Sequence, residues 1–205
     1  MVFSEQSSAD SAFAIMLRVL EQGNIAIAYR PKVDVEAVRD FHDVQRLFIV
    51  LQPDDYRYRL IVIGRKKLPQ PGPNQRFWGI VDRVVDDPAV IQAEFAPYDY
   101  ETKTRGARRQ KAVRLVASGL YAIYRHDDHS HLNFNVEKRV REFGLHVPDY
   151  GEYILTAKNL DLPDRDDDSG RAFKTLRSTE LLDLEGTKLV LIATNHGAQA
   201  LSKLA

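Results

Sequence analysis

The feature that most constrains the fold of this chain is an order of strand and turn segments that recurs along the sequence. Three pairs of similar segments follow one another: Ile25–Arg30 and Leu120–Arg125, Pro53–Asp54 and Pro148–Asp149, and Leu68–Pro69 and Leu162–Pro163. The offsets are 95, 95 and 94 residues. A recurrence at nearly constant spacing indicates an internal duplication, with half-units of about 23–112 and 113–195 that bury their apolar sheet faces against each other.

Short segments rich in Ile, Val, Leu and Phe predict most of the secondary structure. Strands are expected at 25–29, 46–51, 58–64, 77–85, 113–116, 120–124, 131–134, 153–157 and 188–193. Tyr98–Thr104 alternates aromatic or hydroxyl residues with charged ones, which is typical of a strand with one exposed face. Asp87 followed by Pro88 predicts the start of a helix that ends before Pro97.

Two further helical segments belong to the expected fold. Apolar residues at helical spacing predict an N-terminal helix at about 9–22, which Gly23 would end. A second helical segment is expected at 136–143. The sequence therefore predicts an α+β protein, made mainly of antiparallel strands with a few helices, that forms a single structural unit over residues 1–205.

Composition narrows the range of functions. The chain has 29 Lys and Arg residues against 29 Asp and Glu residues, so its formal net charge is zero. Proteins that bind nucleic acid over a large surface carry a basic excess, so this balance is compatible only with a local basic patch. The chain has no cysteine, which excludes disulfides, thiolate nucleophiles and zinc–thiolate sites. A divalent metal cofactor would therefore need His and Asp ligands.

The compartment is predicted from two further absences. The first ten residues lack the basic and apolar regions of a signal peptide. No apolar run approaches the length of a membrane-spanning helix. These observations predict a cytoplasmic protein with no membrane partner.

Segments throughout the chain resemble a family of uncharacterised prokaryotic proteins. The segments are Tyr29–Val33, Asp43–Arg46, Ile63–Pro69, Phe77–Gly79, Tyr100–Gly106, His129–Leu132 and Tyr153–Asn159. The resemblance covers most of the chain from Gly23 to Asn195 and implies one integral fold. The family has no known activity, so the resemblance assigns no catalytic residue.

The sharpest local cluster of candidate catalytic residues is the histidine segment 126–131. On a strand, His129 and His131 would point to the same face, because side chains alternate. Together with Asp128 they are the candidate catalytic residues, as acid and base on a phosphoester, and the two histidines are the candidate metal ligands. The alternative is a polar hairpin turn with exposed histidines, and it is favoured for so short a segment.

A basic cluster supplies the candidate ligand-binding residues. Its members are Arg105, which precedes a predicted turn at 106–111, Arg108, Arg109 and Lys111 in that turn, and Arg65 and Lys66 at the end of an earlier strand. Arginine-rich loops beside tyrosines bind phosphates and stacked bases. The alternative is a solvated turn whose charges are balanced by acidic loops elsewhere, and zero net charge favours it. Trp78, the only tryptophan, is expected to be a buried aromatic anchor.

Three functions follow from these residues. The first is a binding module for an anionic ligand, either a small molecule that carries a phosphate or nucleotide or a nucleic acid. The second is a metal-dependent or phosphoester hydrolase that uses the histidines. The third is a structural or protein-interaction domain. A hairpin turn at Ser118–Gly119 would also bring Arg109 near His129 and create one composite site.

Overall fold

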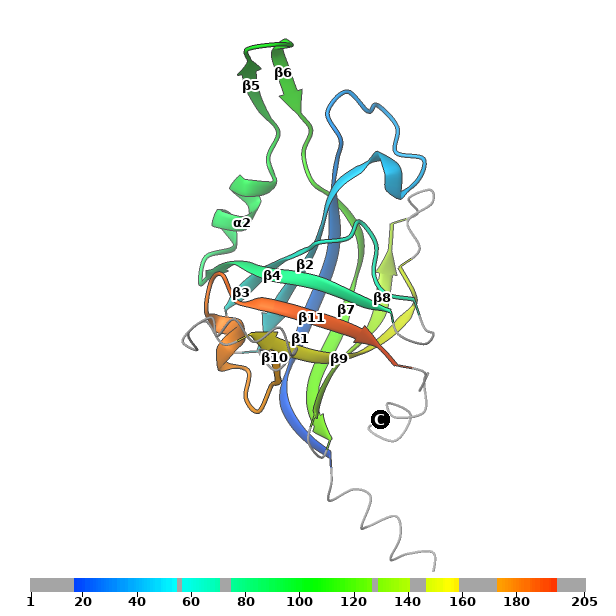
Figure 1. The fold of residues 1–205 in the computed structure, drawn as a ribbon, viewed down its shortest axis with the longest axis vertical. Helices are drawn as coiled ribbons and strands as arrows, with labels where there is room; N and C mark the ends of the chain where they lie inside the picture. Colours follow the sequence, from blue (N-terminus) through cyan, green and yellow to red (C-terminus); the bar gives the residue numbers. More distant parts are fainter. Residues whose placement is uncertain are drawn as a thin grey trace, which may run out of the picture.

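The computed structural model describes residues 17–54, 57–70, 75–126, 129–140, 147–158 and 173–194. Eight antiparallel strands form a closed barrel in the order β1-β2-β3-β4-β11-β9-β8-β7, and β7 pairs with β1 to complete the ring. The barrel strands are β1 (Leu17–Pro31), β2 (Val44–Pro53), β3 (Tyr58–Ile63), β4 (Arg76–Val85), β7 (Arg114–His126), β8 (His129–Arg139), β9 (Tyr150–Lys158) and β11 (Lys188–Ala193). The predicted α+β class is therefore wrong, and the fold is a β-barrel (Figure 1).

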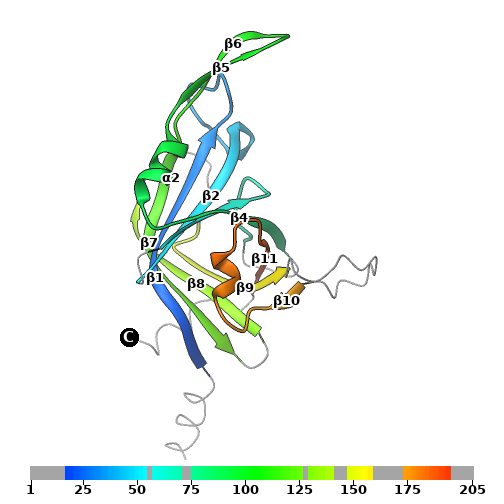
Figure 2. The same ribbon diagram turned by 90° about the vertical axis from the view of Figure 1, so that its left-hand side faces the viewer.

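The remaining elements lie outside the ring. They are the 3₁₀ helices η1 (Phe41–Asp43) and η2 (Glu180–Asp183), the helix α2 (Pro88–Phe95), the strand β10 (Phe173–Thr175), and the strands β5 (Tyr98–Thr102) and β6 (Gly106–Gln110). Figures 1 and 2 both show the β5–β6 hairpin projecting away from the barrel. Asp87 caps α2 by accepting from the Ala89 amide, and Pro88 occupies the first turn, as the sequence predicts. No helix in the described ranges is long and apolar enough to cross a membrane.

Each half of the barrel is a four-stranded meander. The first half contributes β1 to β4, and the second contributes β7, β8, β9 and β11. Asn24 pairs with Leu120 and Ile25 with Gly119, so a twofold axis that relates positions 95 residues apart would pass between these two pairs. The common origin of the two halves stays a prediction, and Leu162–Pro163 lies outside the described residues.

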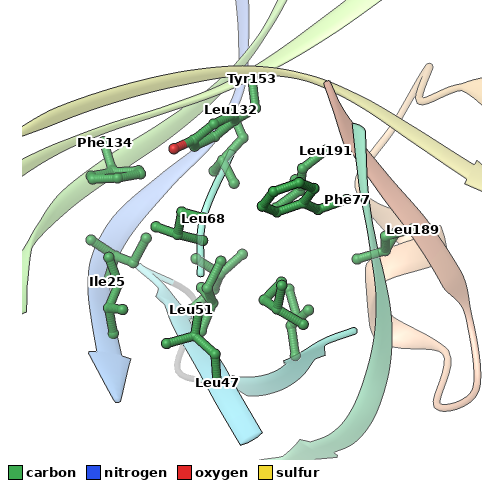
Figure 3. Packing of buried hydrophobic residues seen from close by; sticks show 14 of the residues in the cluster. Ile25, Leu47, Leu51, Leu68, Phe77, Leu132, Phe134, Tyr153, Leu189 and Leu191 are labelled. Atoms are coloured by element: carbon green, nitrogen blue, oxygen red, sulfur yellow. The ribbon is translucent and has the colours of Figure 1, made fainter. Parts of the chain in front are cut away.

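Alternating residues of the barrel strands fill the interior. Ile25, Ile27 and Tyr29 of β1 are buried there, because side chains of a strand point to opposite faces in turn. Figure 3 shows side chains from opposite walls, among them Leu51 and Phe134, packed toward the same centre. An internal cavity between β2, β3, β9 and β11 has a volume of about 10 Å³. A space of this size holds no more than one water molecule, so this part of the interior is a packed core.

In three predicted elements, the structure has a strand where a helix or a turn was expected. Residues 17–22 of the predicted N-terminal helix belong to β1, and residues 9–16 lie outside the described ranges. Residues 136–139 of the second predicted helix belong to β8. Residues 106–110 of the predicted basic turn form β6, and the turn itself occupies 103–105.

Trp78 is not the predicted buried anchor. Its side chain is 54% exposed on the outer face of β4, where it contacts the Phe173 ring edge-on with centroids 4.8 Å apart. The neighbouring Phe77 is the buried aromatic residue, with 5% of its surface exposed. The alternation of β4 decides which of the two adjacent aromatic residues enters the core.

Candidate anion-binding site

The predicted composite site of Arg and His does not exist, because β7 passes through Ser118 and Gly119 as one continuous strand. Its 13 residues span about 40 Å at 3.3 Å per residue. Arg109 lies in the hairpin before the start of β7, and His129 follows its end (Figure 1). The two predicted clusters therefore lie at opposite ends of the barrel.

The histidines do share one face of β8, as the alternation predicts. The rings of His129 and His131 are 4.7 Å apart, and His131 stacks on Tyr124 with an interplanar angle of 2°. The carboxylate beside them is Glu152, whose Oε1 lies 3.0 Å from His131 Nδ1, whereas Asp128 lies outside the described residues. The described side chains contain no group of three His, Asp or Glu arranged to hold a metal ion. A catalytic or metal-binding role of these histidines stays a prediction.

Three of the six residues of the predicted basic cluster are paired with carboxylates. Arg108 Nη2 lies 2.6 Å from Asp34, Lys111 Nζ lies 2.9 Å from Glu36, and Arg109 Nε lies 3.9 Å from Asp99. Asp34 and Glu36 belong to the β1–β2 connection, far from the hairpin in sequence. These pairs agree with the alternative interpretation of balanced surface charges.

The second basic run, Arg65 and Lys66, lies in the connection that follows β3. The Arg65 guanidinium carbon lies 5.4 Å from the centre of the Phe77 ring. None of the six predicted ligand-binding side chains lines the cleft described next.

An open cleft of about 470 Å³ lies on the outer wall of the barrel beside α2. Its position follows from the second, smaller core, in which α2 inserts Ile91 against Phe48 and Leu60 on the outer faces of β2 and β3. The cleft is lined by three arginines, three aromatic residues and four other residues: Arg30, Arg46, Arg83, Phe48, Phe95, Tyr98, Gln45, Asp82, Ala93 and Glu94.

Arg30 forms the inner end of the cleft and is 7% exposed. Its guanidinium donates to the carbonyl oxygens of Glu94 and of Ala96 at 3.4 Å, both at the end of α2, and to that of Lys111 at 2.8 Å. A cation at a helix C-terminus is stabilised by the helix dipole. Burial lowers the pKa of Arg30, and the charge of Arg46 lowers it further. Arg30 therefore holds the end of α2 in place beside the cleft and keeps a positive charge at its inner end.

Arg46 lies directly opposite Arg30 in the pairing of β1 with β2. Like charges at opposing positions of two strands destabilise a sheet. In contrast to Arg83, which contacts Glu94 at 2.5 Å, Arg46 forms an ion pair with no described residue, and its side chain is exposed. The cleft thus contains one uncompensated cation beside a second, buried one.

Tyr98 covers the cleft on the hairpin side. Its ring is 53% exposed and lies 5.6 Å from the guanidinium carbon of Arg30. Sequence reasoning noted Tyr98 beside the basic turn but missed Arg30, Arg46 and Arg83, because they belong to three different strands. The one signal for this cleft in the sequence was the position of Arg30 at the end of the repeated segment Ile25–Arg30.

A second group of charged residues that was not predicted from the sequence lies inside the barrel. Arg59 is 1% exposed and contacts Glu21 at 2.6 Å and Asp183 at 2.8 Å. Tyr121 also donates to Glu21, at 2.7 Å. Burial alone would lower the pKa of Arg59, but its hydrogen bonds to Asp183 and Glu21 raise it. With every charge paired and Leu182 of η2 buried beside it, this group closes the end of the barrel and is structural.

Comparison with known proteins adds no relative to this description, since no family model, no curated protein and no solved structure matches the chain.

Proposed function

We propose that the chain is a binding module for an anionic ligand that carries an aromatic group, such as a nucleotide, and that the ligand binds in the cleft beside α2. The observation that carries the proposal is the unpaired Arg46 opposite the buried Arg30. An anion between them would relieve their mutual repulsion and form charge-assisted hydrogen bonds with guanidinium donors. Tyr98, exposed over the same cleft, offers a face for a base. The volume is within the range of small-molecule sites.

Exchanging Arg46 for glutamate is expected to lower the affinity for AMP at least tenfold, which corresponds to about 1.4 kcal/mol. The fold should be retained, because Arg46 is exposed and a carboxylate at this position would face Arg30. Isothermal titration calorimetry in a low-salt buffer without phosphate measures the affinity. Adenosine, which lacks the anion, should bind far more weakly than AMP.

Arg109→Glu is the matched control, because it changes the net charge by the same amount at an exposed position outside the cleft. Its affinity for AMP should stay within twofold of the wild type. Equal losses in the two variants would mean that AMP responds only to overall charge. Equal binding of AMP and adenosine would mean that no anion site exists.

Removing the ring of Tyr98 tests the aromatic part of the proposal. Tyr98→Ala is expected to weaken AMP binding by about 5- to 150-fold, because stacking of a base on an aromatic ring contributes about 1–3 kcal/mol. The affinity for inorganic phosphate, measured in the same way, should change little. A parallel loss for both probes would show that Tyr98 shapes the cleft and does not stack on the ligand.

A further inference from the structure

A second groove, of about 450 Å³, lies on the outer faces of β1, β7 and β8. The strand register aligns two rows of its residues across the three strands. One row is Gln22, Ala122 and Asn133, and the other is Asn24, Leu120 and Asn135. Neighbouring strands lie about 4.8 Å apart, so each row is about 10 Å long.

The side chains of these rows give the groove an amide-rich lining, to which Asp54 adds one carboxylate that accepts from Gln22 Nε2 at 3.3 Å. Gln22, Asn24 and Asn135 are exposed at its borders, and Leu120 is 50% exposed between the two asparagines. Ala122 is small and leaves the middle of the other row low. Each amide offers both donors and an acceptor, so the surface pairs with groups that also donate and accept, while Leu120 offers an apolar contact.

Asn133, which lines the groove, carries a side-chain acceptor that pairs with no described residue. Burial, followed by the nearby charge of Glu152, raises the pKa of Tyr124 and Tyr150, so both hydroxyl groups keep their protons. They donate to the Glu152 carboxylate at 3.1 and 3.5 Å. Both then accept from Asn133 Nδ2, at 3.4 and 2.8 Å. The direction of this network fixes the orientation of the Asn133 amide.

Asn133 Oδ1 is the other end of that amide. It is buried, and no described residue donates a hydrogen bond to it. A buried acceptor without a donor costs about 1–3 kcal/mol. Because Oδ1 lies just beneath the surface of the groove, a ligand hydroxyl group would reach it after a small shift of the lining side chains and would then remove this cost, whereas an anion would bring no donor.

From the amide rows, the exposed Leu120 and the unpaired acceptor, we propose that this groove binds a neutral carbohydrate. Vicinal hydroxyl groups pair with the amides of Gln22, Asn24 and Asn135, one hydroxyl donates to Asn133, and the ring carbons lie on Leu120. The site is separate from the cleft beside α2, since the two share no lining residue.

Leu120→Arg tests the carbohydrate site, because a long charged side chain in the centre of the groove displaces a sugar ring. Titration of the full chain with glucose, maltose and cellobiose, followed by NMR, should show saturable binding of at least one sugar to the wild type. The variant should bind that sugar at least tenfold more weakly. Leu115→Arg is the control: Leu115 is 39% exposed on the same strand and does not line the groove. Its affinity should stay within twofold of the wild type.

Three results would overturn this assignment. They are the absence of binding of all three sugars to the wild type, equal losses in the Leu120→Arg and Leu115→Arg variants, and loss of sugar binding in the Arg46→Glu variant. The last result would place the sugar in the anion-binding cleft. Failure of AMP binding together with intact sugar binding would refute the proposed function and leave the carbohydrate site in place.

Discussion

Replacement of Arg59 by alanine is expected to lower the free energy of unfolding by about 3–5 kcal/mol, the usual effect of removing one partner of a buried ion pair. The substitution leaves the Glu21 carboxylate, which is 8% exposed, without its cation. It also releases Asp183, through which Arg59 contacts η2. Small domains have a total stability of only about 5–15 kcal/mol. Urea denaturation followed by circular dichroism measures the loss.

Arg57→Ala is the control for Arg59→Ala, since Arg57 is 50% exposed and also contacts Asp183, at 3.6 Å. An exposed pair contributes about 0–1 kcal/mol, so the control should be close to the wild type. Arg59→Met combined with Glu21→Gln should be more stable than Arg59→Ala, because the double variant leaves no unpaired charge at position 21. Equal destabilisation by Arg57→Ala and Arg59→Ala would contradict a buried, charge-paired closure of the barrel.

Phe134→Ala should destabilise the barrel by a similar amount, about 3–5 kcal/mol, because it opens a cavity in the packed interior. Phe134 is 1% exposed, and its ring centre lies 6.0 Å from that of Tyr153 (Figure 3). The same denaturation experiment measures this loss. Leu115→Ala, at an exposed position, should change the stability by less than about 0.5 kcal/mol.

Gly151 supplies an independent check on the position of the Phe134 ring. A Cβ atom at residue 151 would lie 2.2 Å from Cε1 of Phe134, so Gly151→Ala alone should cost about 1–3 kcal/mol by overpacking. In the Phe134→Ala background the new methyl group occupies vacated space, and the double variant should be more stable than the sum of the single effects predicts. Strictly additive effects would show that the ring does not pack against Gly151.

The apolar strands could be predicted from the sequence, whereas the full lengths of β1 and β7, the two longest barrel strands, could not. Segments such as 58–64 and 188–193 are mainly apolar, and their strands agree with the prediction to within a residue. In β1, by contrast, Leu17 and Leu20 have helical spacing, and Gly23 resembles a helix stop. The barrel needs Gly23 for another reason: a Cβ atom there would lie 2.1 Å from the Gln52 carbonyl oxygen.

Gly119 misled the prediction of β7 in the same way. The pair Ser118–Gly119 has the composition of a turn, but it lies at a register shift between β7 and β8. A Cβ atom at Gly119 would lie 1.9 Å from the Asn135 carbonyl oxygen. Glycine within a strand often marks a bulge or a close approach of two backbones, and both conditions depend on a partner strand that one segment of sequence does not reveal.

The candidate site shows why local charge density was a poor guide to binding. Arg108 and Lys111 belong to a dense basic segment, but their charges are balanced by Asp34 and Glu36, more than 70 residues away in the sequence. Arg46 stands alone in the sequence and is a cation that forms no ion pair with a described residue. The pairing of charges is therefore a property of tertiary contacts, whereas the alternation that placed His129 and His131 on one face is local and could be predicted.

The order of strands around the ring has a consequence for how the chain folds. Pairing within each meander links neighbouring segments, but the two seams that join the halves, β1 with β7 and β4 with β11, connect residues 85–116 positions apart. Proteins dominated by such distant pairings fold on the slow scale of milliseconds to seconds. Until both seams form, each meander presents two unpaired edges with free amide and carbonyl groups, the surfaces through which β-proteins aggregate. A fragment that contains only one meander would keep those edges permanently, so solubility of this barrel depends on completing the ring.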